Sequence, residues 1–371
     1  MKGCMKTNFT HGGNVFTIAR SLGVSPEDIL DFSANINPLG PAPGVREALA
    51  GTFARIVHYP DSECNELRDA LARLHGLEPA QVCVANGSTQ LIYLLPRLVP
   101  GKRALVIAPA FSEYAGALAR DGWNVEQFIL DSEDCFNLPV NRLAERLRGG
   151  CDLLVIGNPG NPTGRLYPCS TVRQIIAVCA AAKCFLVLDE AFMDFCEEES
   201  AKHLAREAEN VLILRSLTKF YALPGMRLGY AISSSSTIAR LAGLREPWSV
   251  NTPAQAAGLA SLADGAYAAA TRELVSSCRE SLSVGLAAIP GLAPYPSAAN
   301  YLLVKIEEGP CAEELAERLM AELILIRCCG NFAGLDSRFF RVAVRQRQDN
   351  DRLLASLAAA LATLSGRTIH I

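Results

Sequence analysis

The segment Val211-Leu-Ile-Leu-Arg-Ser-Leu-Thr-Lys219 places a lysine shortly after a run of apolar residues. A short run of this kind, bounded by polar residues, is typical of a strand buried inside a sheet. Arg227 follows eight residues after the lysine. Taken alone, a Ser-x-x-Lys segment is typical of a solvated loop. Its meaning therefore depends on what the rest of the chain places beside it.

Short apolar runs alternate with amphipathic segments between about residues 80 and 230. Continuous Val, Ile and Leu runs separated by helices indicate a mainly parallel sheet that is covered on both faces. In such sheets, ligands bind outside the carboxyl ends of the strands. The predicted strands are 82–85, 104–108, 153–156, 185–188 and 211–214, and the predicted helices include 89–98, 112–121 and 170–182.

The pattern changes after about residue 250, where an Ala-rich stretch predicts one long helical region over 253–288. It is followed by predicted strands at 301–305, 323–327 and 339–344, and by predicted helices at 311–321 and 350–364. This mixture indicates a smaller α+β domain beside the α/β domain. We therefore predict an N-terminal arm over 1–45 that packs with the small domain, a large domain over 46–250 and a small C-terminal domain over 251–371.

The composition narrows the class of protein. Half of the 371 residues are hydrophobic (50%), which is enough for a large core. The net charge is -3 and no arginine-rich run occurs, so we expect no nucleic-acid partner. No apolar run is long enough to span a membrane, and we expect a cytoplasmic protein without a signal peptide. The 13 cysteines are scattered, so we expect reduced thiols and no metal site.

Further motifs follow three of the predicted strands. Asp189 ends one strand, where a buried carboxylate is costly unless it is paired. Asn86-Gly-Ser-Thr89 opens a helix, whose backbone N–H groups suit a phosphate. Asn158-Pro-Gly-Asn-Pro-Thr-Gly164 forms a rigid loop, in which Asn161 can donate a hydrogen bond. Each motif alone also fits an ordinary helix cap or turn.

The combination with the lysine is more specific. A pyridoxal 5'-phosphate (PLP) cofactor requires a lysine, a carboxylate for its ring nitrogen and a cradle for its phosphate. Lys219 and Asp189 supply the first two groups. Ser216 and Arg227 can complete the cradle, because a guanidinium binds phosphate oxygens in pairs. The residues therefore predict a PLP site at the carboxyl edge of the sheet.

The motifs Asn161-Pro-Thr-Gly164, Asp189-Glu-Ala191 and Ser216-Leu-Thr-Lys219 occur in an order that resembles the fold type I PLP-dependent enzymes, the aspartate aminotransferase superfamily. By this resemblance Lys219 is the Schiff-base lysine, Asp189 the partner of the ring nitrogen and Asn161 the donor to the ring oxygen. Phe111 would stack on the ring, and Tyr59 would reach the cofactor phosphate of the neighbouring subunit in a homodimer. The remaining residues implied to bind the cofactor are Gly87, Ser88, Thr89, Ala191, Ser216 and Arg227.

One position departs from the usual aminotransferase pattern. Aminotransferases of this group usually carry a tyrosine directly after Asp-Glu-Ala, and this chain carries Phe192. A phenylalanine cannot donate a hydrogen bond to the cofactor oxygen. Asn161 is then the main donor to that oxygen.

Several segments resemble the threonine-phosphate decarboxylases of cobalamin biosynthesis more closely than the histidinol-phosphate aminotransferases. Phe192 also fits the decarboxylase pattern. The resemblance implies decarboxylation of L-threonine O-3-phosphate to (R)-1-aminopropan-2-yl phosphate. The segments are His11-Gly-Gly-Asn14, Asp31-Phe-Ser-Ala-Asn-Ile-Asn-Pro38, Arg215-Ser-Leu-Thr-Lys-Phe220, Pro247-Trp-Ser-Val-Asn251, Ala299-Asn-Tyr-Leu-Leu303 and Gly334-Leu-Asp-Ser-Arg338.

The same resemblance implies two anion clamps for the substrate. Arg341 would hold the α-carboxylate and Arg327 the phosphate, since arginine forms fork-like hydrogen bonds with such anions. His11, Gly12, Asn35 and Asn161 are the other residues implied to bind substrate. A histidinol-phosphate-type aminotransferase stays open as the alternative, because the two reactions share these motifs. A PLP-binding module without catalysis is the third alternative.

Overall fold

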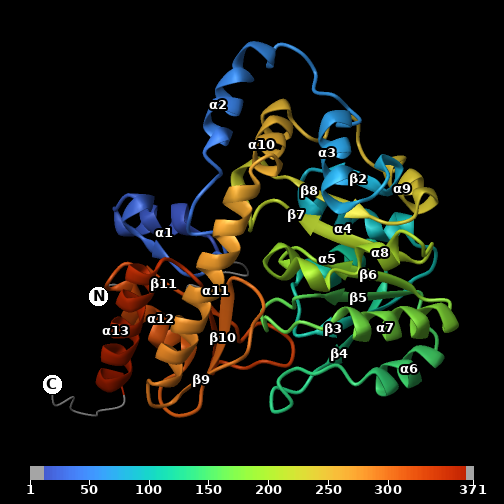
Figure 1. The fold of residues 1–371 in the computed structure, drawn as a ribbon. Coiled ribbons are helices and arrows are strands. Elements are labelled where there is room, and N and C mark those ends of the chain that lie inside the picture. The colour runs from blue at the N-terminus through green and yellow to red at the C-terminus, as the bar shows by residue number, and fades with distance from the viewer. Residues whose placement is uncertain (1–11, 365–371) are drawn as a thin grey trace.

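The computed structural model describes residues 12–364 (Figure 1). Its largest sheet is built from strands that lie between residues 82 and 232. Its strands are β2 (Val82–Ala85), β3 (Arg103–Ala108), β4 (Asn124–Ile129), β5 (Leu153–Gly157), β6 (Phe185–Asp189), β7 (Val211–Ser216) and β8 (Gly229–Ile232). They are ordered β2-β8-β7-β6-β5-β3-β4. The strands from β7 to β4 run parallel, whereas β8 is antiparallel to both of its neighbours.

Helices cover both faces of this sheet. Leu212 and Leu214 pack in one apolar cluster with residues of α4 (Gly87–Leu98), α5 (Glu113–Arg120) and α9 (Ser235–Ala242). Val211 and Ile213 pack on the opposite face with residues of α6 (Val140–Arg148) and α7 (Cys169–Ala181). Continuous apolar strands are what such double burial requires. The predicted α/β fold with a mainly parallel sheet is confirmed.

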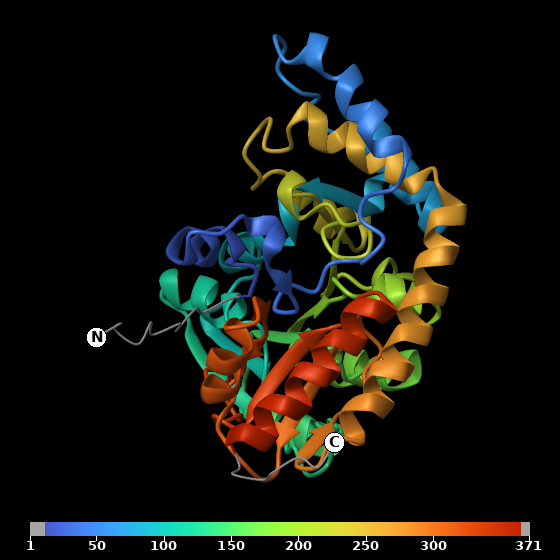
Figure 2. The ribbon, with the colours of Figure 1, turned by 90° about the vertical axis from the view of Figure 1, so that its left-hand side faces the viewer.

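A second sheet follows later in the chain. It contains β9 (Leu292–Pro294), β10 (Tyr301–Ile306), β12 (Arg327–Cys328) and β13 (Phe339–Ala343), all antiparallel, in the order β12-β13-β10-β9. The helices α11 (Gly265–Ala287), α12 (Ala312–Met320) and α13 (Arg347–Leu364) bury apolar residues in one cluster with this sheet. Figures 1 and 2 show α11 as a long helix that joins this part of the molecule to α10 (Thr252–Leu262).

Two predicted elements are wrong in detail. The single helical region over 253–288 is divided into α10 and α11 at residues 263–264, where the Asp264 side chain accepts a hydrogen bond from the Tyr267 N–H and so caps the second helix. The single strand over 323–327 is divided into β11 (Ile324–Leu325) and β12, which belong to different sheets. The break between the two strands is at Ile326, where the chain leaves one sheet and enters the other.

The N-terminal segment lies against the later part of the chain. After α1 (Val15–Leu22), β1 (Leu30–Asp31) pairs in parallel with β11. Figure 1 shows α2 (Gly44–Gly51) beside α10. The remaining helices are α3 (Asn65–His75) and α8 (Lys202–Ala205), with 3-10 turns at Pro26–Asp28, Phe53–Arg55, Pro79–Gln81, Met193–Glu199 and Pro224–Met226. The domain boundaries given above stay a prediction.

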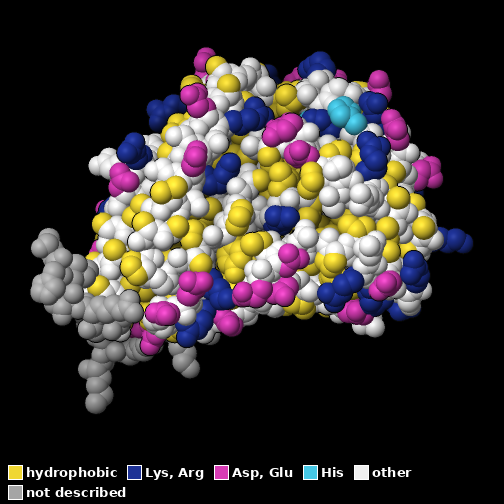
Figure 3. Space-filling model, turned by 60° about the horizontal axis from the view of Figure 1, so that its bottom comes forward, with side chains coloured by type: hydrophobic (Ala, Val, Ile, Leu, Met, Phe, Trp, Pro, Cys, Tyr) yellow, Lys and Arg dark blue, Asp and Glu magenta, His cyan; other side chains and the backbone are white. Residues whose placement is uncertain are grey.

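The surface carries charges of both signs. On the face shown in Figure 3, Lys and Arg side chains are interspersed with Asp and Glu side chains. Within residues 12–364, none of the helices combines the length and the apolar character that crossing a membrane requires.

Candidate active site

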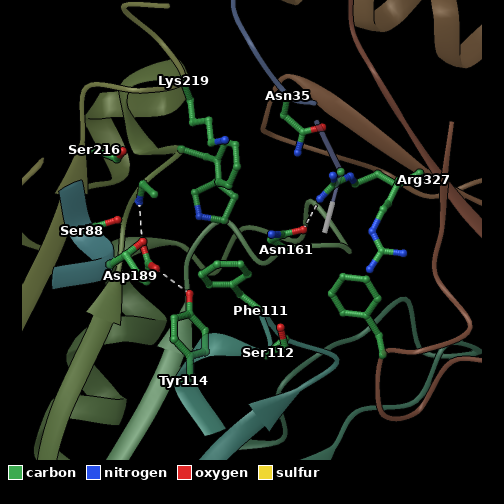
Figure 4. A pocket seen from close by; sticks show the side chains of 18 of the residues that line it. Asn35, Ser88, Phe111, Ser112, Tyr114, Asn161, Asp189, Ser216, Lys219 and Arg327 are labelled. Atoms are coloured by element: carbon green, nitrogen blue, oxygen red, sulfur yellow. Dashed lines mark hydrogen bonds between the residues drawn. The ribbon is translucent and has the colours of Figure 1, made fainter. Parts of the chain in front are cut away.

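A cavity of about 540 Å3 lies at the carboxyl ends of β3, β6 and β7 (Figure 4). Side chains from the sheet, from the loops that follow its strands, from the N-terminal segment and from β12 and β13 meet there. The residues from the sequence prediction that line the cavity are Gly12, Asn35, Ser88, Thr89, Phe111, Asn161, Asp189, Ala191, Ser216, Lys219, Arg227, Arg327 and Arg341.

Lys219 is held just beyond the end of β7. Its carbonyl oxygen accepts a hydrogen bond from the Asn37 N–H at 3.0 Å, and the Asn37 amide donates to the next carbonyl, that of Phe220, at 2.8 Å. Burial, together with the positive charges of Arg341 and Arg227, lowers the pKa of Lys219 to about 8. A substantial fraction of this amine is therefore neutral near physiological pH, and only the neutral form is a nucleophile.

Asp189 ends β6 and points into the same cavity (Figure 4). Its Oδ2 accepts a hydrogen bond from the Tyr114 hydroxyl at 2.6 Å, and its Oδ1 accepts one from the Ala191 N–H at 3.0 Å. Both donors are neutral. Burial raises the pKa of Asp189, while these hydrogen bonds and Lys219 oppose the rise. The carboxylate still has free lone pairs for a cationic ligand in the cavity.

The ends of β6 and β7 present alternate side chains to opposite sides of the sheet. Asp189 and Ser216 face the cavity, whereas Glu190 and Arg215 meet behind it. Arg215 is fully buried, and its Nη1 lies 3.1 Å from Oε2 of Glu190. It also forms ion pairs with Asp194 and Glu197. The two strand ends are thus tied together by an ion cluster directly beneath the cavity.

A polar cradle lies at the first turn of α4. Ser88 and Thr89 line the cavity from this turn, opposite Ser216 and Arg227. Ser216 Oγ and Thr218 Oγ1 are 2.8 Å apart. A methyl group on Gly229 would overlap the backbone nitrogen of Ser88, so β8 approaches the turn as closely as only glycine allows. Hydroxyls, a guanidinium and a helix N-terminus together suit a phosphate.

Arg341 connects the loop after β5 with the N-terminal segment. Its Nη1 donates to the Asn161 side-chain oxygen, and its Nη2 donates to the Ser33 carbonyl at 2.9 Å. The first bond orients the Asn161 amide, because the oxygen faces the guanidinium and the NH2 group stays available as a donor. Tyr301 supports both partners: its hydroxyl donates to the Gly160 carbonyl at 2.6 Å, and Arg341 lies over its ring at 5.2 Å.

Arg327 and Arg341 are direct neighbours across two antiparallel strands, since they are paired in the register of β12 and β13. Residues paired in this way present their side chains to the same face, and two like charges there are destabilising. Arg327 Nη2 donates to Asn331 at 2.9 Å, and its guanidinium lies 5.0 Å from the Phe332 ring centre. Both arginines line the cavity. Such a pair is suited to a ligand that carries two anionic groups.

Two buried polar atoms at the cavity have no hydrogen-bond partner within residues 12–364. They are Oδ1 of Asn35 and Nε of Arg341. A buried polar group without a partner is costly, so a ligand that satisfies these atoms would be favoured.

Among residues 12–364, two predicted site residues do not line the cavity. Gly87 lies beside it, since a methyl group there would come within 2.8 Å of Arg227 Nη2. Tyr59 is 79% exposed and stacks on Trp248, with ring centres 4.6 Å apart. His11 lies outside the described residues.

The structure adds residues that the sequence prediction missed. Tyr114 and Thr218 contact predicted site residues, and Asn331 and Phe332 form the wall behind Arg327. Asn331 and Phe332 lie just before Gly334-Leu-Asp-Ser-Arg338, a segment recognised by resemblance, and this proximity was the available signal. Tyr114 has a weaker signal, namely its place one helical turn after Phe111.

The model of the family described as "Aminotransferase class I and II" matches residues 27–357. The chain belongs to this family. It is 39% identical to a threonine-phosphate decarboxylase of Salmonella typhimurium over 95% of this chain and 97% of that protein. It is also 31% identical to an adenosylcobalamin biosynthesis bifunctional protein CobDQ of Leptospira interrogans, over 93% of this chain and 40% of that protein.

Solved structures of family members resemble the whole fold. The crystal structure of a histidinol-phosphate aminotransferase from Sinorhizobium meliloti in complex with pyridoxal-5'-phosphate has a TM-score of 0.83, with 26% identity over 94% of each chain. An L-threonine-O-3-phosphate decarboxylase from Porphyromonas gingivalis has a TM-score of 0.79, with 25% identity over 89% of this chain and 99% of that chain.

Proposed function

We propose that this protein is a PLP-dependent decarboxylase that converts L-threonine O-3-phosphate to (R)-1-aminopropan-2-yl phosphate and CO2 for cobalamin biosynthesis. The observation that carries the substrate assignment is the pair Arg327 and Arg341, which face one cavity together with Lys219. The 39% identity to the Salmonella decarboxylase supports the choice of reaction.

The cavity fits the cofactor. Asp189 is a buried carboxylate whose two hydrogen-bond donors are neutral, and a protonated ring nitrogen would give it a charged donor. The cradle of Ser88, Thr89, Ser216 and Arg227 would hold the phosphate, and Phe111 and Ala191 would form the walls on either side of the ring. When bound, PLP supplies an electron sink that stabilises the electron pair left on a substrate carbon.

The substrate would be held by its two anionic groups. We assign the α-carboxylate to Arg341 and the phosphate to Arg327, with Gly12 and Asn35 beside it from the N-terminal segment. Asn35 is buried and has an unpartnered oxygen, so a flipped amide would direct its NH2 group toward a phosphate. The predicted role of His11 stays a prediction, because that residue lies outside the described part of the chain.

The chemical step breaks the bond between Cα and the carboxylate, and CO2 leaves. Cα then takes up one proton, which we assign to the amine of Lys219 because this amine has a pKa of about 8 and can carry a proton at neutral pH. Phe192, Phe111 and Phe332 line the cavity and present apolar surface to it, which would disfavour water beside the bound substrate. Phe192 packs edge-on against Tyr301 with ring centres 4.9 Å apart. As a phenylalanine, it has no hydroxyl that could donate to the cofactor oxygen.

A homodimer in the cytoplasm is part of the proposal. An exposed apolar patch on one side of the molecule supports the dimer, since exposed apolar patches mark interaction sites. It consists of Phe53, Ile56, Val57, Tyr59 and Trp248. In such a dimer Tyr59 would reach the partner's cofactor phosphate. The cysteines within residues 12–364 are free thiols, which agrees with a reducing compartment.

The test is the product formed from L-threonine O-3-phosphate labelled in its carboxyl group. Release of labelled CO2 by the purified holoenzyme without 2-oxoglutarate would support the proposal. Amino transfer to 2-oxoglutarate without CO2 release would show a histidinol-phosphate-type aminotransferase instead. Turnover of either kind excludes a module without catalysis.

A matched pair of variants tests the substrate clamp. Arg327→Met removes the proposed phosphate ligand, whereas Arg338→Met removes an exposed arginine whose side chain bonds main-chain carbonyls outside the cavity. We expect Arg327→Met to raise the KM for threonine phosphate by about 100-fold, since charged hydrogen bonds each contribute about 1.5–3 kcal/mol. Arg338→Met should leave this KM unchanged.

A further inference from the structure

The Tyr114 hydroxyl makes the shortest hydrogen bond to Asp189 and has no role in the site as described so far. It lies 2.6 Å from Oδ2 of Asp189, and both side chains are buried. Figure 4 shows Tyr114 below Asp189, on the side away from Lys219. The tyrosine thus contacts the carboxylate on the side away from Lys219, and it also lines the cavity.

The position of Tyr114 is fixed by its surroundings. It begins α5 together with Glu113, and its ring packs edge-on against Phe111 with ring centres 5.7 Å apart. The ring belongs to the apolar cluster between α4, α5 and the sheet. A methyl group on Gly157 would lie 3.6 Å from its hydroxyl oxygen, in ordinary contact, so β5 closes the space behind the hydroxyl.

The tyrosine remains a hydrogen-bond donor over the whole physiological range. Burial and the neighbouring Asp189 raise its pKa well above that of free tyrosine. A donor hydrogen bond stabilises the ionised form of a carboxylate and opposes the effect of burial. The titratable groups that face Asp189 are Tyr114 from α5, Tyr301 from β10 and Lys219 after β7.

We propose that Tyr114 is a positioning residue that keeps Asp189 ionised and directed at the ring nitrogen of the cofactor. The inference rests on the proposed role of Asp189 in binding PLP. Tyr114 also lines the cavity, but its hydroxyl, the only group of its side chain that can donate, is bonded to Asp189, so we assign its effect to this carboxylate. One turn of chain then supplies both the stacking face, Phe111, and the support of the carboxylate.

The experiment compares the holoenzymes of the wild type, Tyr114→Phe and Tyr167→Phe. Tyr167 is the matched control, since it is buried and its hydroxyl donates to the Phe136 carbonyl at 3.0 Å and not to the Asp189 carboxylate. The readout is the nitrogen-15 chemical shift of PLP labelled at its ring nitrogen, followed against pH. This shift reports whether the ring nitrogen is protonated and does not depend on turnover.

We expect Tyr114→Phe to lower the pH at which the ring nitrogen loses its proton by about one unit, a tenfold change in the equilibrium. Its kcat should fall by about tenfold while the KM for substrate stays the same. Tyr167→Phe should match the wild type in all three measurements. An unchanged shift in Tyr114→Phe, or an equal change in both variants, would overturn the proposal.

A double-mutant cycle separates support of Asp189 from simple packing. In the Asp189→Asn background, Tyr114→Phe should cause no further loss of PLP affinity, because the carboxylate that it supports is gone. An equal loss in both backgrounds would show that the tyrosine acts by packing alone. Failure of the proposed function is a separate result, because it would appear as PLP that does not attach to Lys219 or as threonine phosphate that releases no CO2.

Discussion

The lowered pKa of Lys219 leads to a quantitative prediction about how the cofactor attaches. A free lysine has a pKa of 10.5, and in this site the value is about 8. At pH 7 the neutral, nucleophilic form is then about 300-fold more abundant than in a free lysine. Because the charged form is the one disfavoured, the attachment rate should rise about tenfold per pH unit up to pH 8 and level off above it.

The rate can be measured on the apo-protein at saturating PLP. Samples mixed at pH 6–10 are reduced with borohydride at intervals, and the modified Lys219 peptide is quantified by mass spectrometry. After burial, the positive charge of Arg341 is the largest cause of the lowered pKa of Lys219. Arg341→Gln removes this charge, so the pH at which the attachment rate levels off should be higher than in the wild type. Arg347→Gln removes a guanidinium on a side chain that is 84% exposed and should leave the inflection unchanged.

An inflection near 10.5 in the wild type would refute this reasoning, because it would mean that neither burial nor the two guanidinium groups act on the amine. Equal inflections in Arg341→Gln and the wild type would refute the part assigned to Arg341. Because the attachment rates are compared at saturating PLP, weaker PLP binding by Arg341→Gln would appear as a higher PLP concentration needed for saturation and not as a shifted inflection.

Three further substitutions test the ion cluster, the phosphate cradle and the exposed apolar patch. Arg215→Met leaves two buried carboxylates and the partly exposed Glu197 without their shared cation and should lower the free energy of unfolding by about 3–5 kcal/mol in urea titrations; an unchanged midpoint would contradict the ion cluster. Gly229→Ala forces β8 away from the turn at Ser88 and should weaken PLP binding at least tenfold, measured by fluorescence titration. Val57→Lys places a charge in the exposed apolar patch and should shift the sedimentation coefficient from dimer to monomer.

The sequence predicts the central strands well, because burial on both faces demands continuous apolar runs. It misses β4, whose residues are largely exposed, and β8, a short strand that contains Gly229. The division between α10 and α11 had a local signal, since Asp264 is a typical N-cap residue before Gly265. This signal was missed because the Ala-rich sequences on both sides of Asp264 favour helix and suggested one continuous element.

The residues of the candidate site also fall into those that the sequence predicts and those that it does not. Residues at strand ends, such as Asp189 and Lys219, could be predicted because parallel strands bring their carboxyl ends to one edge. Tyr114 could not, since its bond to Asp189 depends on how α5 packs against the sheet. The role of Tyr59 depends on a second chain, so neither the sequence nor the geometry of one chain determines it.

The alternation at the ends of β6 and β7 limits how this enzyme can evolve. Asp189 and Glu190 are neighbours that serve opposite sides of the sheet, so an inserted or deleted residue in β6 would exchange them. The cavity would then receive the glutamate, and Arg215 would lose its ion pair with Glu190 in the same event. We therefore expect length changes in these strands to impair both the site and the ion cluster. New substrate preferences must arise in the loops around Phe192 and Phe332 and in the N-terminal segment.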